Sequence, residues 1–315
     1  MIPPLARSHA ARVVDWRMAD DDAPLDYIAR THAWYGALGY GNPYQYARFD
    51  DVPFAAMRGA LAQARVVLLT TAAPYRPELG DQGAGAAYNA AAKLYEVWSG
   101  DTAAEHDLRV SHVAVDQAQL SDDQNCWFPL PALRRAVAAG RVGGLTARFH
   151  GVPTNRSQRH TIEVDAPEVV RRCLADGADA AVLVANCPVC HQSMSLTARA
   201  LEAAGVATVV MGAAKDIVEQ AGVARFLFSD VPLGNAAGLP WDVGSQDATL
   251  ALALGLLEAA SGPRTTVVNP LRWPGGSAWK RAFMNPDGLT PDEIARRRAE
   301  NDAAKDVAAG LRAKA

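Results

Sequence analysis

Apolar positions along the chain fall into short aliphatic runs, and these alternate with longer stretches that have helical spacing. The runs have the length and the Val, Leu and Ala content of strands buried in a parallel sheet. We predict strands at residues 65–70, 109–115, 180–185, 206–211 and 225–228. We predict helices at residues 128–139, 167–175, 188–204 and 246–260. Strands that alternate with helices at this spacing indicate an α/β fold, with a mainly parallel sheet flanked by helices.

The same pattern suggests how the chain is divided. We expect two similar Rossmann-like lobes, an N-terminal one over residues 1–160 and a C-terminal one over residues 161–270. Residues 1–55 carry aromatic and polar residues without clean periodicity, so they are expected to wrap the first lobe or shape a pocket. Residues 271–315 contain a charged helix and are expected to form a C-terminal arm on the body or on a neighbouring subunit.

Composition narrows the classes of function. The chain has 315 residues, of which 50% are hydrophobic and 21% charged, and its net charge of −3 argues against a nucleic-acid partner. No apolar stretch is long enough to span a membrane, and the N-terminus lacks the pattern of a secretion signal. Four cysteines in a chain of this length form no disulfide framework, which favours the cytoplasm. The C-terminal arm and the apolar balance favour a homodimer.

The most concentrated chemistry is the segment Cys187-Pro-Val-Cys190-His191, where an apolar run becomes a helix. Amide N–H groups and the dipole at a helix start stabilise a thiolate, so Cys187 is the expected nucleophile and Cys190 the resolving thiol. His191 either acts as an acid/base or holds Cys190 in its thiolate form, or it is a polar residue that faces solvent. Alternatively, the two cysteines are small buried core residues, or they provide half of the ligands of a zinc site. No second Cys/His pair with suitable spacing completes such a site, so no cofactor is expected, although a catalytic metal stays open.

Binding residues are expected where the parallel strands end. Thr70 and Thr71 follow one strand, and Asp116 shares a strand face with His112, which makes it the carboxylate for binding or proton transfer. Arg148 and His150 lie in a polar segment suited to a substrate carboxylate, with Arg156 and Arg159 as competitors. Each of these residues also has an alternative role: Cys126 packs in the core, His112 forms a hydrogen bond inside the sheet, and Arg148 lies in a solvated loop. The predicted substrate-binding residues are Thr70, Thr71, His112, Asn125, Cys126, Arg148 and His150.

Residues 187–192 resemble the active-site motif of the selenoprotein B family, the B subunits of D-proline, glycine, sarcosine and betaine reductases. The motif is most similar to the D-proline reductase version, in which selenocysteine stands at the position of Cys187. Further similar blocks follow in the family's order and extend the resemblance over residues 25–260. They are Phe49-Asp-Asp-Val-Pro-Phe54, Ser111-His112 with Asp116, Asn125-Cys-Trp-Phe-Pro129 and Val231-Pro-Leu-Gly-Asn235, the last of which adds Asn235 to the predicted binding residues.

The resemblance implies an enzyme in which residue 187 attacks the substrate, a C–N bond is cleaved reductively, and a nearby cysteine accepts electrons from a thiol donor. Proline reduction in this family also uses a pyruvoyl group on a partner subunit. Because sulfur is less acidic and leaves less readily than selenium, Cys187 is expected to make demanding cleavage slower. We therefore predict a cysteine-dependent enzyme that cleaves a C–N or C–S bond of a small carboxylate-bearing substrate.

Two alternatives stay open. One is a desulfhydrase, in which Cys187 adds to a thioxo heterocycle, sulfide departs and water completes the exchange. The other is a thiol–disulfide electron carrier that serves a partner protein.

Overall fold

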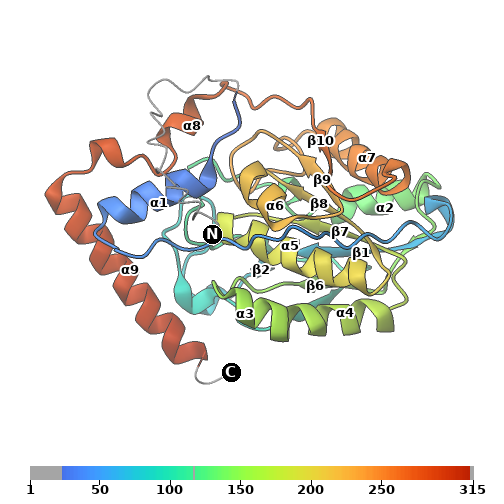
Figure 1. Ribbon diagram of the computed structural model, residues 1–315, viewed down its shortest axis with the longest axis horizontal. Coiled ribbons are helices and arrows are strands. Elements are labelled where there is room, and N and C mark those ends of the chain that lie inside the picture. Colours follow the sequence, from blue (N-terminus) through green and yellow to red (C-terminus); the bar gives the residue numbers. More distant parts are fainter. Residues whose placement is uncertain (1–22, 116–117, 313–315) are drawn as a thin grey trace, which may run out of the picture.

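The computed structural model describes residues 23–115 and 118–312, which form an α/β fold around one mostly parallel sheet of eight strands (Figure 1). The strand order is β10-β9-β8-β7-β1-β6-β3, and β5 also pairs with β1. Only β3 runs antiparallel among the pairings of this sheet. The predicted fold class is therefore confirmed.

The central strands are aliphatic and buried, as a sheet covered on both faces requires. All residues of β7 and β8 are buried, and so are five of the six residues of β1. The strands of the large sheet are β1 (Arg65–Thr70), β3 (Trp98–Asp101), β5 (Gly144–Leu145), β6 (Arg148–Gly151), β7 (Ala180–Val184), β8 (Ala207–Gly212), β9 (Arg225–Phe228) and β10 (Thr265–Val268). A separate antiparallel pair is formed by β2 (Ala73–Pro74) and β4 (Leu108–Arg109).

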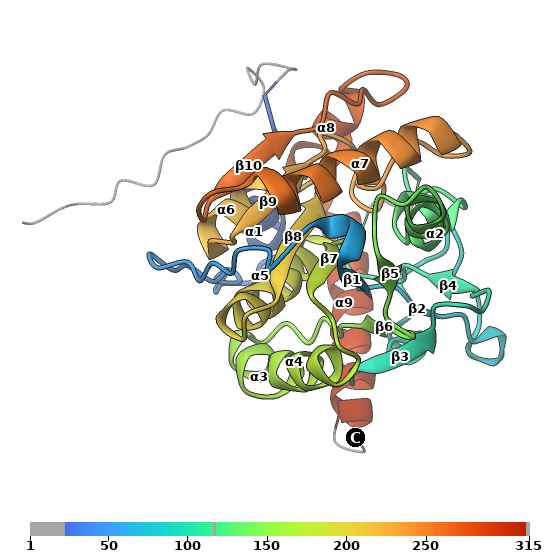
Figure 2. The ribbon, with the colours of Figure 1, turned by 90° about the vertical axis from the view of Figure 1, so that its right-hand side faces the viewer.

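Helices cover both faces of the sheet (Figure 2). One layer holds α4 (Ala166–Ala175), α5 (Pro188–Ala203) and α6 (Lys215–Ala221), and the other holds α2 (Leu130–Ala138) and α7 (Val243–Ala259). A short helix α3 (Gln158–His160) and a π-helical turn (Thr161–Asp165) lead into α4. Outside these layers lie α1 (Tyr27–Ala37), α8 (Ala278–Ala282) and α9 (Pro291–Arg312). Short 3₁₀ turns occur at residues 61–63, 77–79, 90–92, 124–126 and 286–288.

Four predicted strands and four predicted helices are confirmed to within a few residues, but the strand expected at residues 109–115 is wrong. Only Leu108–Arg109 pairs, and the chain then turns through Ala114, whose φ is 65°. The polar segment Arg148–Gly151 is a strand rather than a loop. Strands from both predicted lobes share one sheet, and the division at residue 160 stays a prediction.

The segments at the two ends of the chain pack on the body. The extended stretch after α1 crosses the outer side of α5 (Figure 1), where Ala47 N donates to Gln192 Oε1 at 2.7 Å. Helix α9 lies against the same chain, since Arg298 donates to Leu38 O at 3.2 Å and Tyr40 to Asp302 at 2.8 Å. Among the described residues, no helix combines the length and apolar character needed to cross a membrane.

Candidate active site

The parallel register brings several strand ends to one edge of the sheet, and Cys187 lies there. Thr70 pairs with Val184, the last residue of β7, and Val184 pairs with Met211 of β8. Cys187 is the N-cap residue of α5, and its Sγ accepts a hydrogen bond from Cys190 N at 3.1 Å. A disulfide joins the two cysteines, whose side chains are buried. The predicted position at a strand end and a helix start is therefore confirmed.

His191 is held entirely by backbone groups. Its Nδ1 donates to Cys187 O at 2.7 Å, and its Nε2 accepts from Ala213 N at 2.9 Å and from Ala214 N at 3.1 Å. Because Nε2 accepts two N–H groups, the ring is neutral with its proton on Nδ1, and burial lowers its pKa to about 4. The solvent-facing alternative is wrong, since the ring is fully buried. Both ring nitrogens are therefore engaged by backbone groups.

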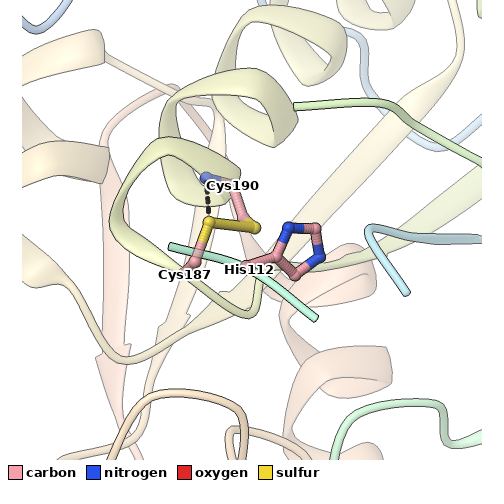
Figure 3. A group of neighbouring side chains, drawn as sticks. All are labelled: His112, Cys187 and Cys190. Carbon is pink, nitrogen blue, oxygen red and sulfur yellow. Dashed lines mark hydrogen bonds between the residues drawn. A yellow bond between two sulfur atoms is a disulfide. The ribbon is translucent and has the colours of Figure 1, made fainter. Parts of the chain in front are cut away.

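His112 lies beside the disulfide (Figure 3), and its ligating nitrogen and the two sulfurs all lie within 4.8 Å of one another. His112 Nε2 donates to Thr71 O at 2.7 Å, and Thr154 Oγ1 lies 3.3 Å from Nδ1. Burial, and then the charge of Lys93, lowers the pKa of His112 to about 4. The structure therefore brings the predicted residues Thr71 and His112 together with the cysteine pair.

Asn186 belongs to the same group of side chains, although sequence reasoning did not select it. Its Nδ2 donates to Thr71 Oγ1 at 3.1 Å, and its buried Oδ1 has no hydrogen-bond partner among the described residues. A buried amide oxygen without a partner is costly, so it is available to a bound molecule. The signal in the sequence was its place between a strand end and Cys187.

Lys93 brings a positive charge to the site, and it too was missed. Its Nζ donates to Thr154 O and lies 5.1 Å from the centroid of the Tyr95 ring. Lys93 and Thr154 line two small cavities, of about 20 and 60 Å³. His112 lines the smaller one, and Arg156 and Lys305 line the larger one. The surrounding Ala-rich sequence gave no sign of this role.

Other predicted binding residues lie apart from the cysteines or are engaged elsewhere. Thr70 is buried, and its Oγ1 accepts from Ala72 N at 3.1 Å. Asn235, on the loop after β9, donates to Gln119 O at 2.9 Å and has a buried Oδ1 without a partner among the described residues. Asn125 lines a different cavity of about 470 Å³, whose described lining includes neither His112 nor Cys187. Burial raises the pKa of the Cys126 thiol to about 12, as for an inert core cysteine.

The solvated-loop alternative for Arg148 is wrong, because Arg148 and His150 lie in a strand, and their predicted role in binding a carboxylate stays a prediction. Arg148 is the first residue of β6 and forms a two-pronged ion pair with Asp176, with Nη2 2.6 Å from Oδ1. His150 is buried, with Nδ1 2.8 Å from Ser99 Oγ and Nε2 3.1 Å from Asp176 Oδ2. Arg148 is therefore engaged within the fold, whereas His150 Nε2 has no hydrogen-bond partner among the described residues. Asp116, the predicted proton-transfer carboxylate, lies outside the described residues.

Comparison with known proteins gives one informative similarity. A stretch of 147 residues, 46% of this chain, is 32% identical to D-proline reductase subunit gamma of Acetoanaerobium sticklandii. The matched stretch spans 60% of the length of that subunit. No family model matches the chain, and no solved structure matches it. The similarity supports a distant relationship to the reductase family and fits a reductase-like role, and it carries no information on cysteine in place of selenocysteine.

Proposed function

We propose that this chain is a cysteine-dependent reductase component that cleaves a C–N or C–S bond of a small carboxylate-bearing substrate. The disulfide between Cys187 and Cys190 carries the proposal, because it joins a helix-capping cysteine at a strand end to a second thiol in the first turn of α5. Such a pair can store the two electrons that a reductive cleavage consumes. The similarity to a reductase subunit supports the same chemistry.

The reaction balances with these two thiols alone. Cys187 Sγ forms a bond to the substrate carbon as the C–N or C–S bond breaks, and the leaving nitrogen or sulfur takes a proton. Cys190 Sγ then attacks Cys187 Sγ, the carbon departs with the electron pair of its bond to sulfur and takes the second proton, and the disulfide forms. An external dithiol restores both cysteines by thiol–disulfide exchange. His191 takes no part in proton transfer here and instead fixes the backbone of Cys187.

A carboxylate-bearing substrate is supported by the positive charges near the site. Lys93, Arg156 and Lys305 line the cavity of about 60 Å³, and Thr154 connects that cavity to His112. An anion drawn to these cations is brought towards the cysteines, because opposite charges in a partly enclosed cavity attract strongly. The relative's printed name makes D-proline, which carries a carboxylate and a C–N bond, the first substrate to test.

The electron-carrier alternative is disfavoured by burial. A carrier must present its attacking sulfur to another protein, whereas Cys187 is 3% exposed and Cys190 is fully buried. No observation in the described residues favours the desulfhydrase.

Alkylation by iodoacetate tests the nucleophile and the charge preference, because iodoacetate is itself a small carboxylate-bearing electrophile. With chelator present, we expect the reduced protein to be alkylated at Cys187. The ratio of iodoacetate to iodoacetamide rates should be about tenfold higher than for free cysteine, which corresponds to about 1.4 kcal/mol of attraction. Lys93→Gln should lower the ratio, whereas Arg148→Gln, at the start of β6 and not among the residues that line the cavity, should not. Alkylation that falls on other cysteines, or a ratio equal to that of free cysteine, contradicts the proposal.

Turnover tests the reaction itself. The reduced protein, with a dithiol and the partner subunits of a D-proline reductase, is given D-proline, and ring opening is followed by mass spectrometry. Cys187→Ser should abolish product, and Cys190→Ser should trap an adduct at Cys187. Cys126→Ser is the matched control and should keep full activity. Product formation by Cys187→Ser at the unmodified rate refutes the assignment of the nucleophile.

A further inference from the structure

We propose that the reduced site binds one zinc ion through Cys187 Sγ, Cys190 Sγ and His112 Nδ1, with a fourth position open. The ligand atoms of these three buried residues all lie within 4.8 Å of one another, and no other trio of this kind was found in the described part of the chain. The sequence offered only a cysteine pair. The third ligand comes from the loop after β4, which the fold brings to the start of α5 (Figure 3).

The orientation of His112 is that of a metal ligand. Since Thr71 O can only accept, His112 Nε2 carries the proton, and Nδ1 presents its lone pair. Metal-binding histidines usually donate their other N–H to a backbone carbonyl or a carboxylate, which fixes the tautomer and the ring. The hydroxyl of Thr154, 3.3 Å from Nδ1, makes only a weak contact that zinc would replace.

The two sulfurs become ligands only after reduction. The disulfide takes two electrons and two protons from a dithiol, and zinc then displaces the two thiol protons. Zinc bonds of about 2.3 Å to sulfur and 2.0 Å to nitrogen place tetrahedral ligand atoms about 3.5–3.8 Å apart, so small movements suffice. The N–H of Cys190, 3.1 Å from Cys187 Sγ, also favours the thiolate form at this helix start.

Two cysteines, one histidine and an open position form a donor set used by catalytic zinc sites. Here the same sulfurs form the disulfide, so zinc and disulfide exclude each other. Bound zinc would therefore protect the dithiol from oxidation and block the attack that we propose for Cys187. The inference needs both cysteines in the thiol form, as the proposed function does, but it does not require either to be a nucleophile.

Metal binding is measured directly, on the full chain and without an activity assay. Equilibrium dialysis against Zn²⁺ should give one zinc per reduced chain and none per oxidised chain. Co²⁺ in place of zinc should give thiolate-to-cobalt charge-transfer absorption. His112→Asn should weaken zinc binding at least tenfold, and Cys187→Ser should remove most of the charge-transfer band.

Three control variants leave the ligands in place. Cys126→Ser removes another buried thiol, His106→Asn removes another histidine, and Thr154→Val removes the hydroxyl that competes for Nδ1. Each should still bind one zinc. The inference is overturned if reduced wild-type protein binds no zinc, if the oxidised protein binds as much zinc as the reduced protein, or if His112→Asn keeps the wild-type affinity. If the reduced protein is alkylated at Cys187 in the presence of chelator but does not bind zinc after the chelator is removed, only this inference is overturned. If it binds zinc but is not alkylated selectively at Cys187, only the proposed function is overturned.

Discussion

Gly212→Ala tests whether His191 fixes the active-site turn. Gly212 ends β8, and a Cβ there would lie 2.6 Å from both Cδ2 and Nε2 of His191. Ordinary contacts begin at 3.4 Å, so the ring must withdraw by about 0.8 Å. That movement breaks the bonds from Ala213 N and Ala214 N to Nε2 and disturbs the bond from Nδ1 to Cys187 O.

The magnitude follows from these contacts. Overpacking costs about 1–3 kcal/mol, and a buried N–H left without an acceptor costs a similar amount. With partial relaxation we expect Gly212→Ala to lower the free energy of unfolding by about 2–4 kcal/mol. It should also slow alkylation of Cys187 by iodoacetate, because the bond from His191 Nδ1 to Cys187 O is disturbed and only the bond from His191 N is left intact.

Urea unfolding followed by circular dichroism measures the first effect. The matched control is Gly255→Ala in α7, where a Cβ meets nothing within 4 Å. That control should be neutral, or more stable by about 0.5–1 kcal/mol, because alanine favours helix. If Gly212→Ala unfolds within about 0.5 kcal/mol of the wild type and keeps the alkylation rate, His191 does not position the turn.

Three further perturbations have defined outcomes. Glu202→Gln should lower the free energy of unfolding by about 3–5 kcal/mol, because it leaves the buried guanidinium of Arg225, which lies 3.0 Å from Glu202 Oε1, without a charge partner. The exposed control Glu300→Gln should lower it by less than about 0.5 kcal/mol, and urea midpoints compare the two variants. Gln192→Ala frees Ala47 N, so limited trypsin digestion should cut faster after exposed Arg48, and an unchanged rate would contradict this anchor. Acid should destabilise the fold, because buried histidines that are neutral in the folded protein, with a pKa of about 4, take up protons on unfolding. Their contribution to stability is complete above about pH 6.5 and falls by about 1.4 kcal/mol per histidine and pH unit towards pH 4. Equal urea midpoints at pH 7 and pH 5 would refute this prediction. The histidines concerned are His112, His150 and His191.

The fold was predictable where local pattern and burial agree. Strands β7 and β8 are aliphatic and fully buried, so their sequence has no competing signal. Strand β6 reads Arg-Phe-His-Gly, and its polar side chains find partners in Asp176 and Ser99, which lie far from it in the sequence. Strand β10 reads Thr-Thr-Val-Val and lies at a partly exposed edge of the sheet, so four residues give only a weak local signal and pairing to β9 sets its structure.

Parts of the candidate site were also predictable from local sequence, and other parts were not. Cys187 and Cys190 were predictable, because a strand end, a proline and a helix start adjoin within one segment. The contacts of His191 were not, because its partners are backbone N–H groups of Ala213 and Ala214, which any residue type supplies. Lys93 is placed at the site by the conformation of the loop around it, and no residue spacing in the sequence predicts this position.

The cysteine pair and the residues around it have different parts in determining the reaction. In the reaction that we propose, the helix-capping Cys187 and the second thiol of Cys190 would supply the nucleophile and the electrons whatever the substrate, since both lie at the start of α5. The proposed charge selection would come instead from Lys93, Arg156 and Lys305, which belong to three separate segments, and Lys305 lies on the C-terminal helix. Because connecting segments vary more readily than a buried strand end, a relative can keep the pair and change its substrate. Substitutions at these cations should therefore change which molecules react, whereas substitutions at Cys187 should change whether any molecule reacts.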